Sequence, residues 1–233
     1  MDFYEMNWLK WSDMKQYGPS SRHLRRLIFN IIKNLNFNSV MDIGCGEGSF
    51  LKELFFLRQG IDVIGIDISS NAISLAKKKI SNGIFKVLNA EKEIIDLKAD
   101  LVVCCDVIEH IVNDQFVINN LAYASNRYIL ISTLQGQMRD IEKDVGHVRN
   151  YSKEDLFNKF KNAGISIVKV LEWGFPFYSP LYRNILSVPK INKLTYGKFN
   201  LLQRIAAYLI YFIFYLNSYK KGDYLIILGE VNR

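Results

Sequence analysis

The segment Val40-Met-Asp-Ile-Gly-Cys-Gly-Glu-Gly48 decides the fold of this chain, because a short apolar run passes directly into a turn with glycine at every second position. The run Val40–Ile43 is typical of a buried strand, and Ser49–Arg58 has the pattern of a helix. Glycines allow a sharp turn whose backbone can lie against a ligand, with a helix N-terminus behind it. A Gly-rich turn alone specifies no particular ligand.

Strand and helix patterns alternate from residue 38 onward. Apart from Val40–Ile43, the predicted strands are Asp62–Ile66, Ile84–Leu88, Leu101–Cys105, Tyr128–Ser132, Ile165–Leu171 and Tyr224–Leu228. Further helices are predicted at Arg22–Lys33, from a Ser69 or Ser70 cap to Lys79, at Gln115–Ala124, and from the capping box at Ser152 to Ala163. This alternation predicts an α/β fold with a doubly wound sheet and right-handed crossovers.

Composition and cysteine usage set the class of protein. The chain has 233 residues, 49% of them hydrophobic, which is enough for one domain with a sizeable core and too apolar for a disordered chain. Its three cysteines, Cys45, Cys104 and Cys105, show no metal-binding or disulfide spacing and are expected to be reduced core residues. The start of the chain lacks the basic-then-apolar pattern of a secretory signal. The longest uncharged stretch, Ile205–Tyr219, is too short to span a bilayer. We therefore expect a cytoplasmic protein, with peripheral membrane contact left open.

The net charge of +7 is unevenly distributed. Residues 1–40 carry +3, residues 41–150 carry −3, and residues 151–233 carry +7. Between residues 173 and 222 there is no Asp or Glu, while there are seven Lys or Arg. A mildly acidic middle segment is therefore followed by a basic, aromatic one.

Carboxylates around the Gly-rich turn narrow the choice of ligand. Asp42 precedes the first glycine, Glu47 lies inside the turn, and Asp67 ends the second strand, where it can accept hydrogen bonds from ribose hydroxyls. Two carboxylates at the turn disfavour a pyrophosphate and favour a cation. S-adenosylmethionine, which combines a ribose with a sulfonium and carries no phosphate, fits this pattern.

Three motifs in order resemble the class I S-adenosylmethionine-dependent methyltransferases: the segment 40–48, Gly65-Ile-Asp-Ile-Ser69, and Asp106-Val-Ile-Glu-His-Ile111. The last is similar to the branch that contains the quinone-biosynthesis O-methyltransferases. The resemblance implies a Rossmann-like sheet of order 3-2-1-4-5-7-6 with strand 7 antiparallel. It also implies one methyltransferase domain over 1–233, with an N-terminal helical cap (1–37), a cofactor-binding core (38–172), a lid or helical insertion (173–222) and a final strand (223–233).

The resemblance also implies roles for cofactor-binding residues. Asp42 and the backbone of the turn would hold the methionine portion of S-adenosylmethionine, Asp67 the ribose, and Ile68 the adenine ring. Asn89 and Ala90 stand where the family often has Asp-Ala at the adenine amino group, so Asn89 is a departure that can still accept a hydrogen bond. Asp106 would line the floor below the methionine end. The turn positions are Gly44, Cys45, Gly46 and Gly48.

Candidate catalytic residues follow the fourth and fifth strands. His110 and His147 both lie in loops that face the cofactor in this fold, so either could act as a general base or orient the acceptor, with Glu109 beside them. Asp106, Glu109 and His110 also fall at i, i+3 and i+4, which predicts one side of a helical turn and, with His147, an alternative Mg²⁺ or transition-metal site that we do not favour.

The segment 173–222 is predicted to supply the acceptor pocket. Residues 175–182 have the aromatics and prolines of a lid, and Leu201–Leu216 reads as a helix that is apolar nearly all round. We expect this helix to be buried or to form a dimer, and the second interpretation is that it lies in a membrane surface. Nucleic-acid binding ranks last because the basic residues are dispersed.

We expect methyl transfer from S-adenosylmethionine, leaving S-adenosylhomocysteine, to a small-molecule or lipid-linked acceptor, at oxygen rather than nitrogen. The alternatives are a metal-assisted RNA 2′-O-methyltransferase and a non-catalytic cofactor-binding subunit of an assembly.

Overall fold

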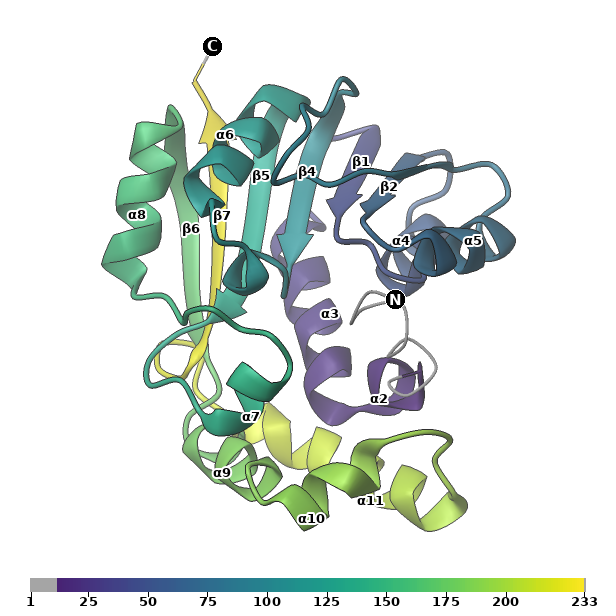
Figure 1. The fold of residues 1–233 in the computed structure, drawn as a ribbon, viewed down its shortest axis with the longest axis vertical. Helices are drawn as coiled ribbons and strands as arrows, with labels where there is room; N and C mark the ends of the chain where they lie inside the picture. The colour runs from purple at the N-terminus through teal and green to yellow at the C-terminus, as the bar shows by residue number, and fades with distance from the viewer. Residues whose placement is uncertain (1–11, 233) are drawn as a thin grey trace.

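A single seven-stranded sheet forms the centre of the molecule in the computed structural model, which describes residues 12–232 (Figure 1). The first eleven residues of the predicted N-terminal cap lie outside the described residues. The strand order is β3-β2-β1-β4-β5-β7-β6, and β7 runs antiparallel to both of its neighbours, β5 and β6. The predicted topology is therefore confirmed. The strands are β1 (Ser39–Ile43), β2 (Asp62–Asp67), β3 (Ile84–Val87), β4 (Ala99–Cys105), β5 (Ser125–Leu134), β6 (Ile165–Trp173) and β7 (Tyr224–Val231).

Helices cover both faces of the sheet, which explains why its central strands are apolar throughout. On one face, α3 (Pro19–Ile32), α4 (Ser49–Leu57) and α5 (Ser70–Lys79) share a buried cluster with the strands. On the other face, α6 (Asp114–Ala124) and α8 (Lys153–Asn162) share a second cluster. The predicted helix caps are present, since Ser69 Oγ accepts from Ala72 N and Ser152 forms its capping box with Asp155.

Residues between β6 and β7 build a separate layer at the carboxyl ends of the parallel strands (Figure 1). Asn217 holds the start of this layer to its end, because its Oδ1 accepts hydrogen bonds from the backbone of Phe177 and Tyr178. The elements of the layer are a kinked turn (Phe177–Tyr182), α9 (Arg183–Leu186), α10 (Pro189–Asn192), a 3₁₀ turn (Lys193–Thr195), α11 (Leu201–Ile213) and a second 3₁₀ turn (Phe214–Leu216).

The inner side of α11 packs on the N-terminal helix α3. His23 is fully buried there, its Nε2 lies 2.7 Å from the Tyr211 carbonyl oxygen, and its ring stacks on Trp173 at 5.3 Å. His23 therefore has a structural position and is remote from the other two histidines. No helix among residues 12–232 is long and apolar enough to cross a membrane.

Candidate active site

The Gly-rich turn after β1 has a backbone that only glycine suits at its first position. Gly44 has φ +75°, and a Cβ placed on it would lie 2.2 Å from a methyl carbon of Val107, in the loop after β4. Such a contact requires one of the two loops to move. The amides of Gly44 and Cys45 both donate to the carbonyl oxygen of Ile66, which fixes the turn against the end of β2.

Asp67 joins the turn to the end of β2 through both of its carboxylate oxygens. Its Oδ2 accepts from the Gly46 amide at 2.8 Å, and its Oδ1 accepts from the Ser69 amide at 2.9 Å. The next residue, Ile68, is 44% exposed, so an apolar side chain stands open beside this carboxylate.

Asp42 is buried next to Asp67, and the pKa of Asp42 is raised well above its usual range, first by burial and then by the negative charge of Asp67. A cation from a distant part of the sequence partly offsets these charges. Lys15, on α2 (Ser12–Tyr17), is close enough to Asp67, Asp106 and Asp42 for each to favour its protonated form, although burial lowers its pKa to about 8. Nothing in the sequence pattern pointed to Lys15.

Two residues predicted to lie in the cofactor region, Glu47 and Asn89, contact other residues of the protein. Glu47 forms an ion pair with Lys79 of α5 and accepts a hydrogen bond from Ser49. Asn89 Oδ1 accepts from the Glu91 amide at 3.0 Å, while its backbone amide donates to Glu93. Ala90 is half-buried, and its carbonyl oxygen accepts from Asn120.

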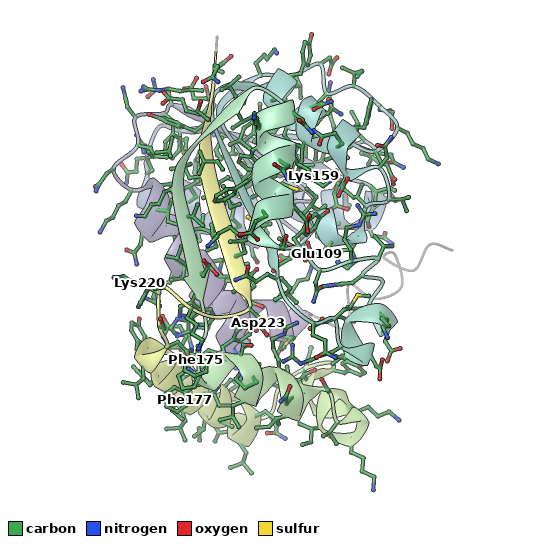
Figure 2. The ribbon with its side chains drawn as sticks, turned by 90° about the vertical axis from the view of Figure 1, so that its left-hand side faces the viewer. Glu109, Lys159, Phe175, Phe177, Lys220 and Asp223 are labelled. Carbon is green, nitrogen blue, oxygen red and sulfur yellow. The ribbon has the colours of Figure 1, made fainter. Side chains whose placement is uncertain are left out.

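Glu109, His110 and His147 come together where the loops after β4 and β5 meet. Their ligand atoms all lie within 4.8 Å of one another, and the two imidazole rings are 4.6 Å apart in an edge-to-face arrangement. The Val148 amide donates to the Glu109 carbonyl oxygen at 2.9 Å, which holds the two loops together. Figure 2 shows Glu109 near the level where the sheet meets the layer that carries Phe175 and Phe177.

Burial controls the protonation of this cluster. Glu109 is 1% exposed, and burial together with the negative charge of Asp106 raises its pKa to about 8, although Thr133 Oγ1 donates to it at 2.8 Å. Burial and the neighbouring His147 lower the pKa of His110 to about 4. Burial also lowers the pKa of His147, whose Nε2 lies 4.0 Å from Glu109 Oε1. Near neutral pH both imidazoles are therefore uncharged.

Asp106 does not belong to this cluster, so the prediction of one helical face for Asp106, Glu109 and His110 was wrong. Asp106 has φ +55°, a left-handed conformation that a non-glycine residue rarely adopts, and the 3₁₀ turn begins only at Ile108. The side chain of Asp106 is exposed and accepts a hydrogen bond from the Tyr224 hydroxyl. Strained residues of this kind gather at functional sites.

A chain of polar contacts connects His147 to the layer of residues 174–222. His147 Nδ1 lies 3.5 Å from Asn150 Oδ1, and Asn150 Nδ2 donates to Glu142 Oε2 at 3.0 Å. Glu142, on α7 (Asp140–Asp144), forms a buried ion pair with Arg183 of α9, which also pairs with Asp223 at the start of β7. Ion pairs of Arg183 thus connect the loop that carries His147 to the α9–α11 layer.

The same three side chains could share one metal ion, although the donor set does not suit Mg²⁺. Two imidazoles and one carboxylate are typical ligands of transition metals, whereas Mg²⁺ prefers oxygen ligands throughout. The proximity of the donor atoms is compatible with a transition metal and equally with proton transfer between the groups.

Comparison with protein families gives a match over residues 37–173, to a model described as "Methyltransferase domain". The chain belongs to this methyltransferase family. It is a class I S-adenosylmethionine-dependent methyltransferase domain, as the sheet order and the three motifs implied.

Curated relatives of this methyltransferase domain match over part of their length. Protein 235L of Invertebrate iridescent virus 6, which carries a methyltransferase name, is 33% identical over 149 residues, covering 62% of this chain and 52% of the viral protein. The ubiquinone biosynthesis O-methyltransferase of Rickettsia felis is 30% identical over 141 residues, covering 55% of this chain and 56% of the relative. The chain thus spans a little over half the length of these relatives.

Solved structures show the same fold. The magnesium protoporphyrin IX methyltransferase of Synechocystis, solved with bound S-adenosylhomocysteine, superimposes with a TM-score of 0.60 at 17% identity. The alignment covers 95% of this chain and 86% of that one. At this identity the likeness establishes the fold alone and carries no information on the acceptor.

Proposed function

We propose that this methyltransferase binds S-adenosylmethionine at the Gly44–Gly48 turn and transfers its methyl group to an oxygen of a small-molecule or lipid-linked acceptor. The observation that carries the proposal is the position of Asp67, whose carboxylate is held by Gly46 and Ser69 at the edge of the turn. Such a carboxylate is preorganised to accept hydrogen bonds from ribose hydroxyls. The names of the Rickettsia relatives favour an oxygen acceptor.

The charges around the turn match the groups of the cofactor. Asp42 and Asp106 both lie close to Lys15, and when ionised they would favour the amino and sulfonium cations, while the Lys15 ammonium suits the methionine carboxylate. Ile68 provides an exposed apolar contact for the adenine ring. The sulfonium supplies an activated methyl group, so the protein has to align the acceptor and exclude water.

His147 is the proposed general base for a hydroxyl acceptor. His147 Nε2 lies 4.0 Å from Glu109 Oε1, so a proton taken up by the imidazole would be stabilised when Glu109 is ionised, which requires a pH above its pKa of about 8. His110 is the poorer base at neutral pH because its pKa is about 4, and we assign it the role of orienting the acceptor. The loops that carry the two histidines are held together by the Val148–Glu109 hydrogen bond.

Methyl transfer from labelled S-adenosylmethionine to quinol, sugar and RNA acceptors tests this proposal. With an accepted substrate, His147→Ala should lower kcat by about 10²–10⁴-fold while the Kd for the cofactor stays within twofold. His147→Gln, which keeps a polar side chain that cannot act as a base, should lose the same activity. Unchanged turnover in both variants would remove His147 from the mechanism.

Two further outcomes of the same assay identify the alternatives. Turnover confined to RNA and abolished by EDTA would favour metal-assisted 2′-O-methylation, for which the grouping of Glu109, His110 and His147 is the supporting observation. Cofactor binding with no turnover on any acceptor would favour a non-catalytic subunit. The proposal predicts activity that is indifferent to EDTA.

A further inference from the structure

The outer side of α11 and the turn after it carry a continuous apolar stripe that no described residue covers. Its residues recur at helical spacing, and each is between 44% and 76% exposed. Only Ala207 of α11 is buried, which excludes a core helix. We call this set the α11 stripe: Leu201, Leu202, Ile205, Leu209, Phe212, Ile213 and Leu216.

An apolar groove borders the end of the α11 stripe. The groove has a volume of about 550 Å³, and its lining is apolar except for Asn184. Phe175 in its wall is joined to the end of the stripe, since the Ser218 amide donates to the Phe175 carbonyl oxygen at 2.7 Å. Phe175 and Phe177 lie in the lowest layer of the molecule (Figure 2). The groove wall is therefore linked by a backbone hydrogen bond to the segment that follows the stripe.

The same segment of the chain carries exposed positive charge. Five exposed lysines belong to residues 174–222, none of them forms a salt bridge within residues 12–232, and the segment contains no Asp or Glu. Lys221 lies over the Phe175 ring at 4.4 Å, at the junction of stripe and groove. The lysines are Lys190, Lys193, Lys198, Lys220 and Lys221.

From these observations we infer that the α11 stripe and the adjoining groove dock on an anionic lipid surface, with α11 lying in the plane of the headgroups. Leucine, isoleucine and phenylalanine on one face with lysines at the border is the pattern of an interfacial helix. Lysines near an anionic surface add electrostatic attraction to the burial of the apolar side chains. A second copy of the chain is disfavoured as the occupant, because a symmetric contact would oppose two basic surfaces that lack any carboxylate.

The location of this surface also suits the reaction, a point that rests on the proposed function. The layer lies at the carboxyl ends of the strands, and Arg183 links it to Glu142 in the loop that carries His147 (Figure 1). Docking would therefore bring the acceptor side of the domain to the membrane, where a lipid-linked acceptor would be found.

Vesicle flotation tests the inference without cofactor or turnover. Vesicles of phosphatidylcholine with 30% phosphatidylglycerol, a typical anionic composition, should carry the wild-type protein to the top of the gradient, and raising the salt should weaken this. The variant Leu202→Glu/Leu209→Glu/Leu216→Glu should float at least tenfold less. The matched control is Phe56→Glu/Leu57→Glu/Ile94→Glu. It changes three apolar residues outside residues 174–222 that are about as exposed as the three leucines, and it should float like the wild type.

Three results would overturn the inference. The first is a wild-type protein that stays at the bottom of the gradient with anionic vesicles. The second is an equal loss of flotation in the control variant. The third is a dimer in solution that the leucine substitutions dissolve, or an RNA complex, in the absence of flotation. Calorimetric binding of S-adenosylmethionine by the leucine variant separates failure of docking from failure of the proposed function, and shows that the variant is folded.

Discussion

Gly44 shows at the scale of one residue how the sequence constrains the site. Its positive φ can be expected from its place in the turn, but its contact with Val107 depends on two loops that lie more than sixty residues apart in the chain. Lys15 is likewise brought to the site by the tertiary fold, since it lies on the short helix α2 and is close to Asp42, Asp67 and Asp106. The sequence predicts residues within motifs well and residues that arrive from elsewhere poorly.

Gly44→Ala should destabilise the domain more than Gly60→Ala. Both glycines have positive φ, but a Cβ on Gly60 meets nothing within 4 Å. Backbone strain of about 1–2 kcal/mol is therefore common to both variants, and only Gly44→Ala adds a packing cost of about 1–3 kcal/mol against Val107. Urea denaturation measures the difference. Equal losses of stability would show that the Val107 contact relaxes freely.

Glu109→Gln should change the pH dependence of stability. Glu109 has a pKa of about 8 in the folded protein and an ordinary value of 4.5, so between these pH values the folded state keeps a proton that the unfolded state has released. The free energy of unfolding of the wild type should therefore fall, relative to the glutamine variant, as pH rises from 4.5 to about 8. Urea titrations at several pH values measure this difference, and parallel curves would contradict the assigned burial effect.

Lys15→Ala should weaken S-adenosylmethionine binding by about tenfold, equivalent to about 1.4 kcal/mol. The reason is the loss of the ammonium group proposed to pair with the methionine carboxylate of the cofactor, beside Asp42, Asp67 and Asp106. Lys15→Arg keeps the charge and should retain most of the affinity. Tighter binding by Lys15→Ala would mean that the lysine competes with the sulfonium.

At the scale of elements, the buried strands were predicted within about one to three residues because their apolar runs end abruptly at polar or glycine residues. Short helices such as α7 and α9 were missed, since helices of four or five residues depend on tertiary contacts more than on intrinsic propensity. The loop after β4 was predicted as a regular helical turn, and the left-handed Asp106 broke that pattern.

Arg183→Met should destabilise the domain by about 3–5 kcal/mol, because it leaves the buried Glu142 without its charged partner on α9. Adding Glu142→Gln to this variant removes the charge that Arg139, 3.9 Å away, would be left to balance alone, and should restore part of the loss. A double-mutant cycle by chemical denaturation measures the coupling between the two side chains. Strictly additive effects would show that α7 and α9 are held together by packing alone.

At the scale of the whole molecule, charge and shape divide the chain into two regions. The segment 41–150, which carries the turn, Asp67 and the 3₁₀ turn of Glu109 and His110, has a net charge of −3, whereas residues 151–233 carry +7. The sequence revealed this division, but it could not decide whether α11 was buried, because an all-round apolar helix suits a core as well as a surface. The exposure of the α11 stripe decided that question.

Isothermal titration calorimetry tests whether this domain uses S-adenosylmethionine at the Gly44–Gly48 turn. The wild-type protein should bind S-adenosylmethionine and S-adenosylhomocysteine at one site per chain, and Asp67→Ala should raise both Kd values at least tenfold. Asp62→Ala, at the exposed opposite end of β2, should bind like the wild type. Absence of binding by the folded wild-type protein, or equal affinity in Asp67→Ala, would contradict cofactor use at this turn.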